Sequence, residues 1–399
     1  MAQVTRTRIV GWGALTGAGR GPSVFWEALC AARPLQQTHD LGDLRLSEAR
    51  WVAIPEPREP QPDLATTWLN LAIHDALLLA APSLSRLAAP RVALLCGSSL
   101  GGMSLFEAHH RRLWDPHRNA GPGLPTEVTE LSRALYDGPT KEVAKRTLPS
   151  AFALTLNTAC SSSANALGLG RLWLALHRID VAVVAGVDVI SPFVYAGFQC
   201  LGAVDPKPST PFAAERRGLN LGEAAAAFVL VRAEDAAPLD LPIDLIGYGS
   251  SCDAYHLTRP DPGGLGLVRA IATALDDAHL QPEAIGLVSS HGTGTLQNDS
   301  MEAAAFATSF GSTIPPFHCA KPIAGHALGA SGAIDALAVL LMLQQQILPS
   351  TFLRGSEDPT LPCHPERQQR SLAAETVALS TSSGFGGSNA ALLLQRGDV

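Results

Sequence analysis

The stretch Asn157-Thr158-Ala159-Cys160-Ser161-Ser162-Ser163-Ala164-Asn165-Ala166-Leu167 joins a strand-like run to a helical one. The helical pattern continues to residue 177, so the sequence predicts Cys160 at a strand-to-helix turn. Backbone N–H groups and the positive end of the helix dipole at such a turn stabilise a thiolate and can hold an oxyanion. On this stretch alone two interpretations stay open, a nucleophile or a small cysteine buried in a core turn.

Short apolar runs that end in turns of small residues recur along the chain, at 91–96, 181–185, 285–290 and 377–380. Such continuous apolar character is typical of strands buried on both faces of a sheet. Longer stretches with helical periodicity lie between them, at 68–79, 161–177, 264–278, 299–309 and 328–345. Because strands and helices alternate, the sequence predicts an α/β fold.

Two helix–strand pairs indicate an internal duplication. The helix at 161–177 leads to the strand at 181–185, and the helix at 328–345 leads to an expected strand at 348–352. Both helices begin just after a reactive candidate, Cys160 or His326, so pseudo-symmetric halves would bring the two helix starts together. Residues 236–242 are the natural boundary between the halves, 103–150 are expected to form an irregular inserted subdomain, and 354–372 an exposed polar loop.

The composition excludes several classes of protein. Of 399 residues, 46% are hydrophobic and 16% charged, which supports a large buried core and excludes wholesale disorder. A net charge of −7 without a basic run argues against a nucleic-acid partner. We expect no membrane span, because the apolar run at 336–343 is far too short, and no signal peptide, because the sequence from Gly13 onward is turn-rich and lacks an apolar region. Seven scattered cysteines without a CxxC pair argue against disulfides or a zinc site and for the cytoplasm.

A second candidate motif, His291-Gly292-Thr293-Gly294-Thr295, follows a predicted buried strand. A histidine at the carboxyl end of such a strand lies where α/β folds bind ligands. The two threonine hydroxyls could bond an amide-bearing arm, although the motif could also be a glycine-rich turn with an incidental histidine. Asp299 and Glu302 follow on a helix, and Glu302 is expected to pair with a buried cation rather than to act on a substrate.

Two further motifs lie towards the C-terminus. In Lys321-Pro322-Ile323-Ala324-Gly325-His326, a histidine opens a helix of small residues. The helix dipole favours the neutral imidazole, which can donate its Nε2–H to an oxyanion, unless the histidine only caps its own helix. The run Gly384-Phe385-Gly386-Gly387-Ser388-Asn389 holds one aromatic ring among glycines, which is either a movable gate or an ordinary turn.

In this order along one chain, the four motifs resemble the elongating β-ketoacyl-ACP synthases, the type I and II condensing enzymes of the thiolase superfamily. The likeness covers nearly the whole chain, from 8–17 to 384–389. It implies a thiolase-like, duplicated, five-layered α-β-α-β-α fold. The N-terminal half (1–238) would carry the nucleophile and an inserted cap region at about 103–150, and the C-terminal half (239–399) the two catalytic histidines.

The resemblance also implies a role for each candidate residue. Cys160 would accept the acyl group, and His291 and His326 would bind the malonyl thioester carbonyl and stabilise the enolate. Lys321 and Glu302 would support the histidines through a buried charge network. The remaining roles would be an oxyanion hole of the Cys160 and Phe385 N–H groups, a gate at Phe385, pantetheine contacts at Thr293 and Thr295, and an acyl pocket lined by Leu100 and Phe198.

The implied reaction is decarboxylative condensation of malonyl-ACP with an acyl chain delivered by acyl-ACP, in fatty-acid or discrete-enzyme polyketide or polyene synthesis. No cofactor or metal is implied, because the carrier protein supplies the phosphopantetheine arm. The partners would be acyl carrier protein and a second subunit, in a homodimer or in a heterodimer with a chain-length-factor-like chain. The alternatives are an initiating synthase or thiolase, a non-catalytic partner subunit, and a cysteine hydrolase; the Cys160, His291 and His326 set argues against each.

Some positions depart from the family pattern. Pro211-Phe212-Ala213 stands where Pro-Phe-Asp is usual, Cys319-Ala320 precedes Lys321 and Pro322 follows it, and Gly202 and Ala203 replace an arginine that often touches the carrier. Residues 56–63 are acidic where relatives tend to be basic. These departures favour a specialised pathway over housekeeping fatty-acid synthesis.

Overall fold

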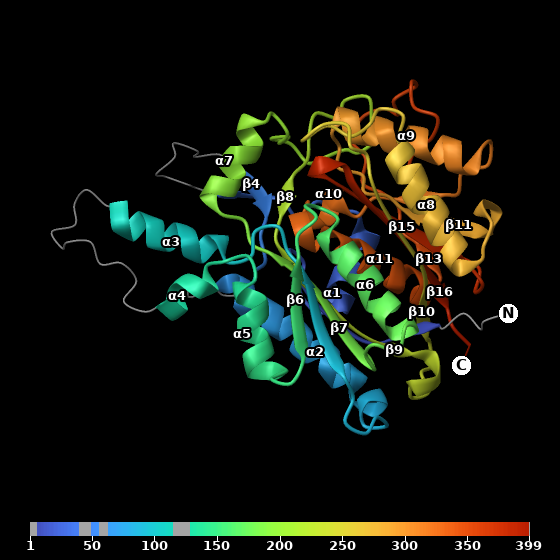
Figure 1. The fold of residues 1–399 in the computed structure, drawn as a ribbon. Helices are drawn as coiled ribbons and strands as arrows, with labels where there is room; N and C mark the ends of the chain where they lie inside the picture. Colours follow the sequence, from blue (N-terminus) through green and yellow to red (C-terminus); the bar gives the residue numbers. More distant parts are fainter. Residues whose placement is uncertain (1–5, 40–48, 56–62, 115–127, 399) are drawn as a thin grey trace.

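The computed structural model describes residues 6–39, 49–55, 63–114 and 128–398, and ten main strands form one continuous sheet path through the molecule (Figure 1). The N-terminal strands are β1 (Thr7–Thr16), β5 (Val92–Gly97), β6 (Phe152–Leu156), β7 (Val181–Asp188) and β9 (Ala224–Arg232). The C-terminal strands are β10 (Ile243–Cys252), β11 (Ile285–Ser289), β12 (Phe317–His318), β15 (Val377–Gly384) and β16 (Ser388–Arg396).

The two sets of strands have the same topology. Their spatial orders are β6-β5-β7-β9-β1 and β12-β11-β15-β16-β10, which is order 3-2-4-5-1 in each half. In each half the first three of these neighbours pair in parallel and the last two pairings are antiparallel. β1 and β10 join the halves through a short antiparallel pairing between 7–9 and 243–245. The duplication indicated by the sequence is therefore present in the strand order.

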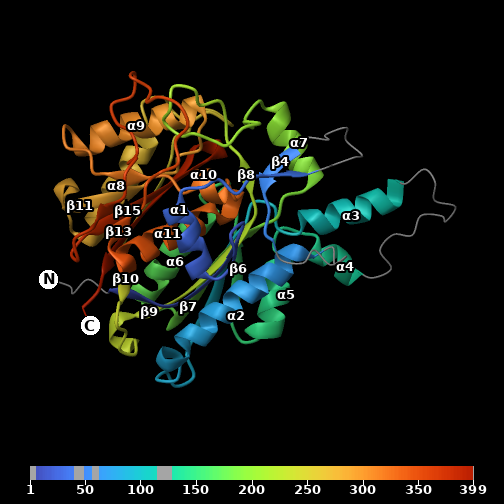
Figure 2. The ribbon, with the colours of Figure 1, turned by 180° about the vertical axis from the view of Figure 1, so that it is seen from behind.

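Helices cover both outer faces and fill the space between the halves (Figures 1 and 2). The helices are α1 (Pro22–Ala31), α2 (Leu64–Leu84), α3 (Met103–Trp114), α4 (Val128–Arg133), α5 (Gly138–Thr147), α6 (Ser162–Ala175), α7 (Pro192–Cys200), α8 (Leu265–Ala278), α9 (Leu296–Phe310), α10 (Lys321–Ala324) and α11 (Ser331–Gln345). Short strands complete the fold: β2 (Gly19–Arg20), β3 (Gln37–His39), β4 (Ala49–Val52), β8 (Leu221–Gly222), β13 (Ile347–Leu348) and β14 (Arg370–Ser371).

The three largest hydrophobic clusters lie between the layers of helices and sheets, one between the two sheets and one on the outer side of each sheet. Alternate residues of β7 face opposite ways: Val183 packs with α2 on the outer side, and Val184 packs with α6 and α11 on the inner side. On β16, Leu392 faces the same inner cluster, whereas Leu393 faces α8 and α9. The strands are thus buried on both faces, which is why each reads as a continuous apolar run. The layered α-β-α-β-α arrangement that we expected is confirmed.

The two central helices meet at their starts. A Cβ atom at Gly332 would lie 2.6 Å from the backbone nitrogen of Ala164, so only glycine allows this approach. The backbone N–H of Ala333 donates to Ser163 Oγ at 2.8 Å. Because α6 follows Cys160 and α11 follows His326, this contact brings the two reactive candidates to the centre of the molecule.

Two expectations about the chain's organisation need correction. The described part of 103–150 is largely helical, with α3 and α4 extending from the body and α5 packed beside it (Figure 1). The sequence suggested an irregular segment because α3 and α5 are polar on average. The strand expected at 348–352 is only the two-residue β13, which pairs with β14 outside the main sheet. The topological counterpart of β7 is β15, so residues 349–376 form an extra segment. The division between halves at 238 and 239 stays a prediction.

Among the described residues, two helical stretches are apolar and long enough to cross a membrane, 64–84 and 328–345. We expected no such stretch, because the unbroken apolar run near the second is short. In the structure 89% of the second stretch and 44% of the first are buried inside the protein. The second stretch lies between the two sheets, whereas the first packs one face against the outer side of the N-terminal sheet.

Candidate active site

A cavity of about 300 Å³ opens where the ends of both halves meet. Its wall contains side chains from distant segments of the sequence: Cys160, Phe198, Arg217, His291, Thr293, Thr295, Asn298, His326 and Phe385. Cys160, His291 and His326 are only 6%, 2% and 2% exposed, whereas Phe385 is 38% exposed. The cavity therefore runs from an open mouth to a buried end that holds one thiol and two imidazoles.

Cys160 lies on a tight turn between β6 and α6. The preceding Ala159 has a φ of 52°, which turns the chain sharply, and Gly384 packs so closely that a Cβ there would lie 2.9 Å from the Cys160 nitrogen. The backbone N–H groups of Phe385 and of Cys160 itself lie close enough to the sulfur to lower the pKa of its thiol. These are the two N–H groups expected to form an oxyanion hole, and the structure brings them together at the thiol.

The expected resting thiolate is not supported. Burial raises the pKa of the Cys160 thiol to about 12, although the Lys321 ammonium and the two N–H groups act in the opposite direction. α6 begins only at Ser162, so the end of its dipole is two residues away. Desolvation outweighs these favourable contributions, and the resting sulfur is a neutral thiol.

His326 is held in one tautomer. The backbone N–H of Leu328 donates to its Nδ1 at 3.3 Å, and Ser331 Oγ lies 2.8 Å from the same atom. Because a backbone N–H is always a donor, Nδ1 is the acceptor and the neutral ring carries its proton on Nε2. Burial, then the Lys321 charge, lowers the pKa of His326 well below its usual value. The ring is therefore an uncharged hydrogen-bond donor at neutral pH.

His291 faces His326 at the same end of the cavity. The two ring centroids are 5.2 Å apart and the planes meet at 86°, in an edge-to-face arrangement. Burial, followed by the charges of Lys321 and of a protonated His326, lowers the pKa of His291 well below its usual value. Two uncharged imidazoles can therefore stand side by side without charge repulsion.

The part expected of Glu302 needs correction, because among the described residues Glu302 forms no ion pair, and Lys321 pairs with Asp335 instead. The Glu302 carboxylate accepts the backbone N–H groups of His291 and Gly292, both at 2.7 Å, and a hydrogen bond from Thr381 Oγ1 at 3.1 Å. Burial raises the pKa of Glu302 to about 7. Glu302 thus holds the turn that carries His291 in place by accepting its backbone hydrogen bonds.

The partner of Lys321 is Asp335, which we had not identified from the sequence. Lys321 Nζ lies 2.7 Å from Asp335 Oδ2, and the two side chains are 3% and 1% exposed. Asp335 is the single charged residue of α11, in Ser-Gly-Ala-Ile-Asp-Ala-Leu-Ala-Val-Leu-Leu-Met-Leu-Gln-Gln. A single carboxylate in an otherwise apolar helix could have indicated a buried ion pair, since a buried carboxylate needs a partner.

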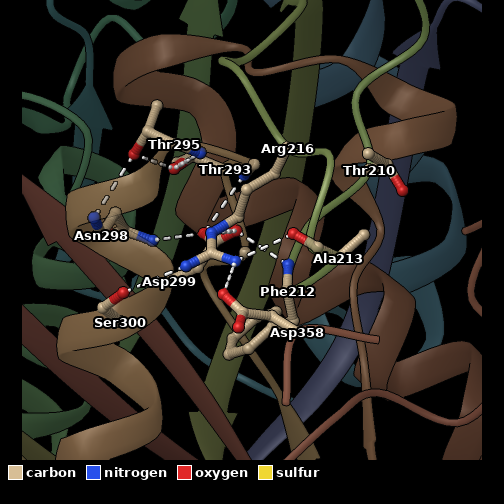
Figure 3. Close-up of polar contacts among 12 residues, drawn as sticks. Thr210, Phe212, Ala213, Arg216, Thr293, Thr295, Asn298, Asp299, Ser300 and Asp358 are labelled. Carbon is tan, nitrogen blue, oxygen red and sulfur yellow. Dashed lines mark hydrogen bonds and ion pairs between the residues drawn. The ribbon is translucent and has the colours of Figure 1, made fainter. Parts of the chain in front are cut away.

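The turn with Thr293 and Thr295 lines the cavity, and a polar cluster lies behind it (Figure 3). The two threonine Oγ1 atoms are 3.0 Å apart. Asp299 accepts the N–H groups of Gly294 and Phe212, at 3.1 and 2.9 Å. The buried Arg216 lies beside Asp299 and pairs with Asp358 at 2.6 Å. Asp358 belongs to the segment expected to be an exposed loop, which therefore supports the site.

The two candidate lining residues differ in position. Phe198, on α7, lines the cavity and stacks with Phe385 at a centroid distance of 5.9 Å. Leu100 is not in the cavity wall; it packs in a neighbouring apolar cluster with Phe198 and Leu328. Its backbone N–H donates to the buried Asp188, which also accepts the N–H of Gly329.

Fold and site together define a class, the thiolase-like acyltransferases. Two family models match the chain: "Beta-ketoacyl synthase, N-terminal domain" over residues 48–236 and "Beta-ketoacyl synthase, C-terminal domain" over residues 244–353. The chain belongs to the β-ketoacyl synthase family, whose members act in fatty-acid or type II polyketide biosynthesis.

The relatives come from both kinds of pathway. The "Putative polyketide beta-ketoacyl synthase 1" of Streptomyces cyaneus is 32% identical, with 98% of this chain and 97% of the relative covered. The 3-oxoacyl-acyl-carrier-protein synthase 2 of a Synechocystis strain is 29% identical, with 99% and 100% covered. A solved ketosynthase from Xenorhabdus doucetiae, in complex with its chain length factor, is 28% identical with a TM-score of 0.84, over 100% and 99% of the two chains.

Proposed function

We propose that this chain extends an acyl group on Cys160 by two carbons from malonyl-ACP, in a discrete-enzyme polyketide or polyene pathway. One observation carries the proposal: a single cavity ends in a thiol flanked by two neutral imidazoles. The departures at Ala213 and around Lys321 favour a specialised pathway, as does the likeness to the Streptomyces relative.

In the first step the Cys160 sulfur attacks the thioester carbonyl of acyl-ACP. The new C–S bond forms as the bond to the pantetheine sulfur breaks, and the proton of the Cys160 thiol ends on the departing pantetheine thiol. The N–H groups of Cys160 and Phe385 would stabilise the tetrahedral oxyanion, because they already point at the sulfur. A thiol that is neutral at rest limits acylation until the substrate's carbonyl is in place.

In the second step malonyl-ACP occupies the same cavity. His326 donates its Nε2–H to the thioester carbonyl, with His291 as the second donor, while the C–C bond to the carboxylate breaks. CO₂ leaves, the electron pair forms the enolate, and its carbon attacks the Cys160 thioester. The Cys160 thiolate is expelled and takes up a proton from solvent. Each such oxyanion donor lowers a barrier by about 3 kcal/mol in comparable sites.

Positioning groups complete the proposed site. Thr293 and Thr295 would bond the amides of the pantetheine arm. The acyl chain would run from Cys160 past Phe198 into the apolar cluster that holds Leu100, since Phe198 belongs both to the cavity wall and to that cluster. Phe385, which is followed by two glycines with φ near 80°, would swing between the acylation and condensation steps.

A second thiolase-fold chain would pair at the sheet edge formed by β6. This strand is the last of the sheet path, and its Phe152 is 57% exposed. An apolar edge strand of this kind is normally covered. We propose either a second copy or a chain-length-factor-like subunit, which the native mass of the chain alone and of the co-expressed pair would distinguish. The seven unpaired cysteines agree with a cytoplasmic location.

Acylation of the purified protein tests the proposal. We expect acyl-ACP to add one acyl mass to the peptide that contains Cys160, without release of free acid, and Cys160→Ala to abolish the addition. Cys200→Ala is the matched control, because Cys200 is exposed and should not be acylated. Continuous release of free acid would instead identify a hydrolase, and addition at Cys200 would contradict the assigned nucleophile.

A further inference from the structure

One charged residue stands in the cavity wall among the described residues. Arg217 lines the cavity, and none of the other described lining residues is Asp, Glu, Lys or Arg. Arg217 is exposed, so it lies towards the mouth of the cavity rather than at the buried end with Cys160. Within the described chain Arg217 forms no ion pair, unlike its neighbour Arg216. A free guanidinium in a substrate cavity is a binding group for an anion.

The start of α9 faces the same cavity. Leu296, Gln297 and Asn298, the first three residues of this 15-residue helix, all line the wall. The Asn298 N–H is capped by Thr295 Oγ1 at 3.4 Å. The N–H groups of Leu296 and Gln297 have no partner within the helix, because the first turn of an α-helix leaves its donors open. These donors and the positive end of the dipole favour an anion at the position that Arg217 borders.

The segment 216–218 holds Arg217 beside this helix start. Arg216 Nη2 donates to Ser300 Oγ of α9 at 3.1 Å (Figure 3). On the other side, the Gly218 carbonyl lies so close to Gly294 that a Cβ there would be 2.7 Å away. Both neighbours of Arg217 are therefore anchored to the 294–300 region. Its position is set by the fold, although its side chain is exposed.

The nearby acidic residue does not cancel this positive region. Asp299 belongs to the first turn of α9, but its carboxylate accepts the N–H groups of Phe212 and Gly294 and lies near the Arg216 guanidinium (Figure 3). Asp358 pairs with Arg216 on its other side. Arg216 offsets one of these two negative charges, and backbone N–H groups hold the Asp299 carboxylate. Neither carboxylate forms an ion pair with Arg217 among the described residues, so the Arg217 guanidinium stays available to an anion in the cavity.

We propose that Arg217 and the N-terminus of α9 bind the phosphate of the substrate's phosphopantetheine arm. This inference rests on the proposed function, which supplies a substrate that carries one phosphodiester at the outer end of the arm. The phosphate would dock at the mouth, the amides would lie against Thr293 and Thr295, and the thioester would reach Cys160. Free coenzyme A carries phosphates of the same chemistry. We propose that the phosphate bound here is the one on the arm attached to the carrier protein.

The test compares three malonyl thioesters: malonyl-ACP, malonyl-phosphopantetheine and malonyl-pantetheine, which has no phosphate. For the wild type we expect malonyl-phosphopantetheine to have a KM at least tenfold lower than malonyl-pantetheine, since a charge-assisted contact contributes that much. In Arg217→Ala this ratio should fall at least fivefold, with a smaller change in kcat, and Arg217→Lys should restore part of it. Arg86→Ala, an exposed arginine outside the cavity wall, is the matched control.

Three other outcomes of this comparison would each contradict a different part of the proposal. Equal effects of Arg217→Ala on both small thioesters would contradict phosphate binding. A loss confined to malonyl-ACP would place Arg217 against the carrier's surface instead of the phosphate. If the wild type forms no acyl-Cys160 and releases no CO₂ from any of the three, the proposed function fails and this inference fails with it.

Discussion

Replacement of Lys321 by methionine changes both stability and the pH range of activity. Methionine keeps the length of the side chain and removes its charge, so the buried Asp335 loses its ion-pair partner at 2.7 Å. Breaking a buried pair from one side costs about 3–5 kcal/mol. Burial already raises the pKa of Asp335, so this carboxyl can escape its charge by taking a proton. We therefore expect a loss near the lower limit, or about 4 °C in melting temperature for a chain of this length.

The same change alters the histidines. The Lys321 charge lowers the pKa of His291 and of His326, so its removal raises both values. As a general scale, two unit charges about 8 Å apart at an effective dielectric constant of about 20 interact by about 2 kcal/mol, which corresponds to about 1.5 pKa units. The imidazoles would then become protonated at a higher pH. The acid limb of malonyl decarboxylation should move up by about one pH unit.

The assay is CO₂ release from malonyl-ACP between pH 5 and 8, with thermal unfolding measured on the same preparations. Lys145→Met is the control, because Lys145 is exposed on α5. The double variant Lys321→Met, Asp335→Leu should be more stable than the sum of the single changes predicts. An unchanged acid limb in Lys321→Met would refute the argument that this ammonium keeps the imidazoles neutral.

Three more changes test other parts of the structure. Glu302→Ala leaves the buried Gly292 N–H unpaired and leaves the His291 N–H with Thr381 Oγ1 as its acceptor. It should reduce the free energy of unfolding by about 1–3 kcal/mol in a denaturant titration, and a loss well below about 1 kcal/mol would show that Glu302 is not needed to hold this turn. Asp188→Ala removes the acceptor shared by the Leu100 and Gly329 N–H groups and should lower decarboxylation more than tenfold, whereas retention of full activity would separate Asp188 from the site. Phe152→Glu should shift the native mass towards the monomer, and an unaltered mass would remove β6 from the subunit interface.

The fold could be predicted from the sequence because its strands are buried on both faces. Such strands appear as uninterrupted apolar runs, and four of them were located within a few residues. The strand expected at 348–352 was wrong, since Ile347-Leu348 continues the apolar pattern although it pairs outside the main sheet. The helices α3 and α5 were missed although their apolar residues recur at helical spacing, because both segments are polar on average.

The residues of the candidate site could be predicted from the sequence, but the ion-pair and hydrogen-bond partners of these residues were harder to predict. Cys160, His291, His326 and Phe385 do line one cavity. Glu302 was expected to pair with a buried cation, and the partner of Lys321 was not identified. In the structure Lys321 pairs with Asp335 of α11. The ionisation of Cys160 was also misjudged, since the helix dipole can be inferred locally but desolvation depends on the whole fold.

The central claim is that a neutral imidazole at His326 drives the loss of CO₂ independently of the Cys160 sulfur. CO₂ release from malonyl-ACP should therefore continue in Cys160→Gln, which cannot form an acyl-enzyme, and should disappear in His326→Ala, although Cys160 in that variant still becomes acylated. Decarboxylation at the wild-type rate by His326→Ala would contradict the account.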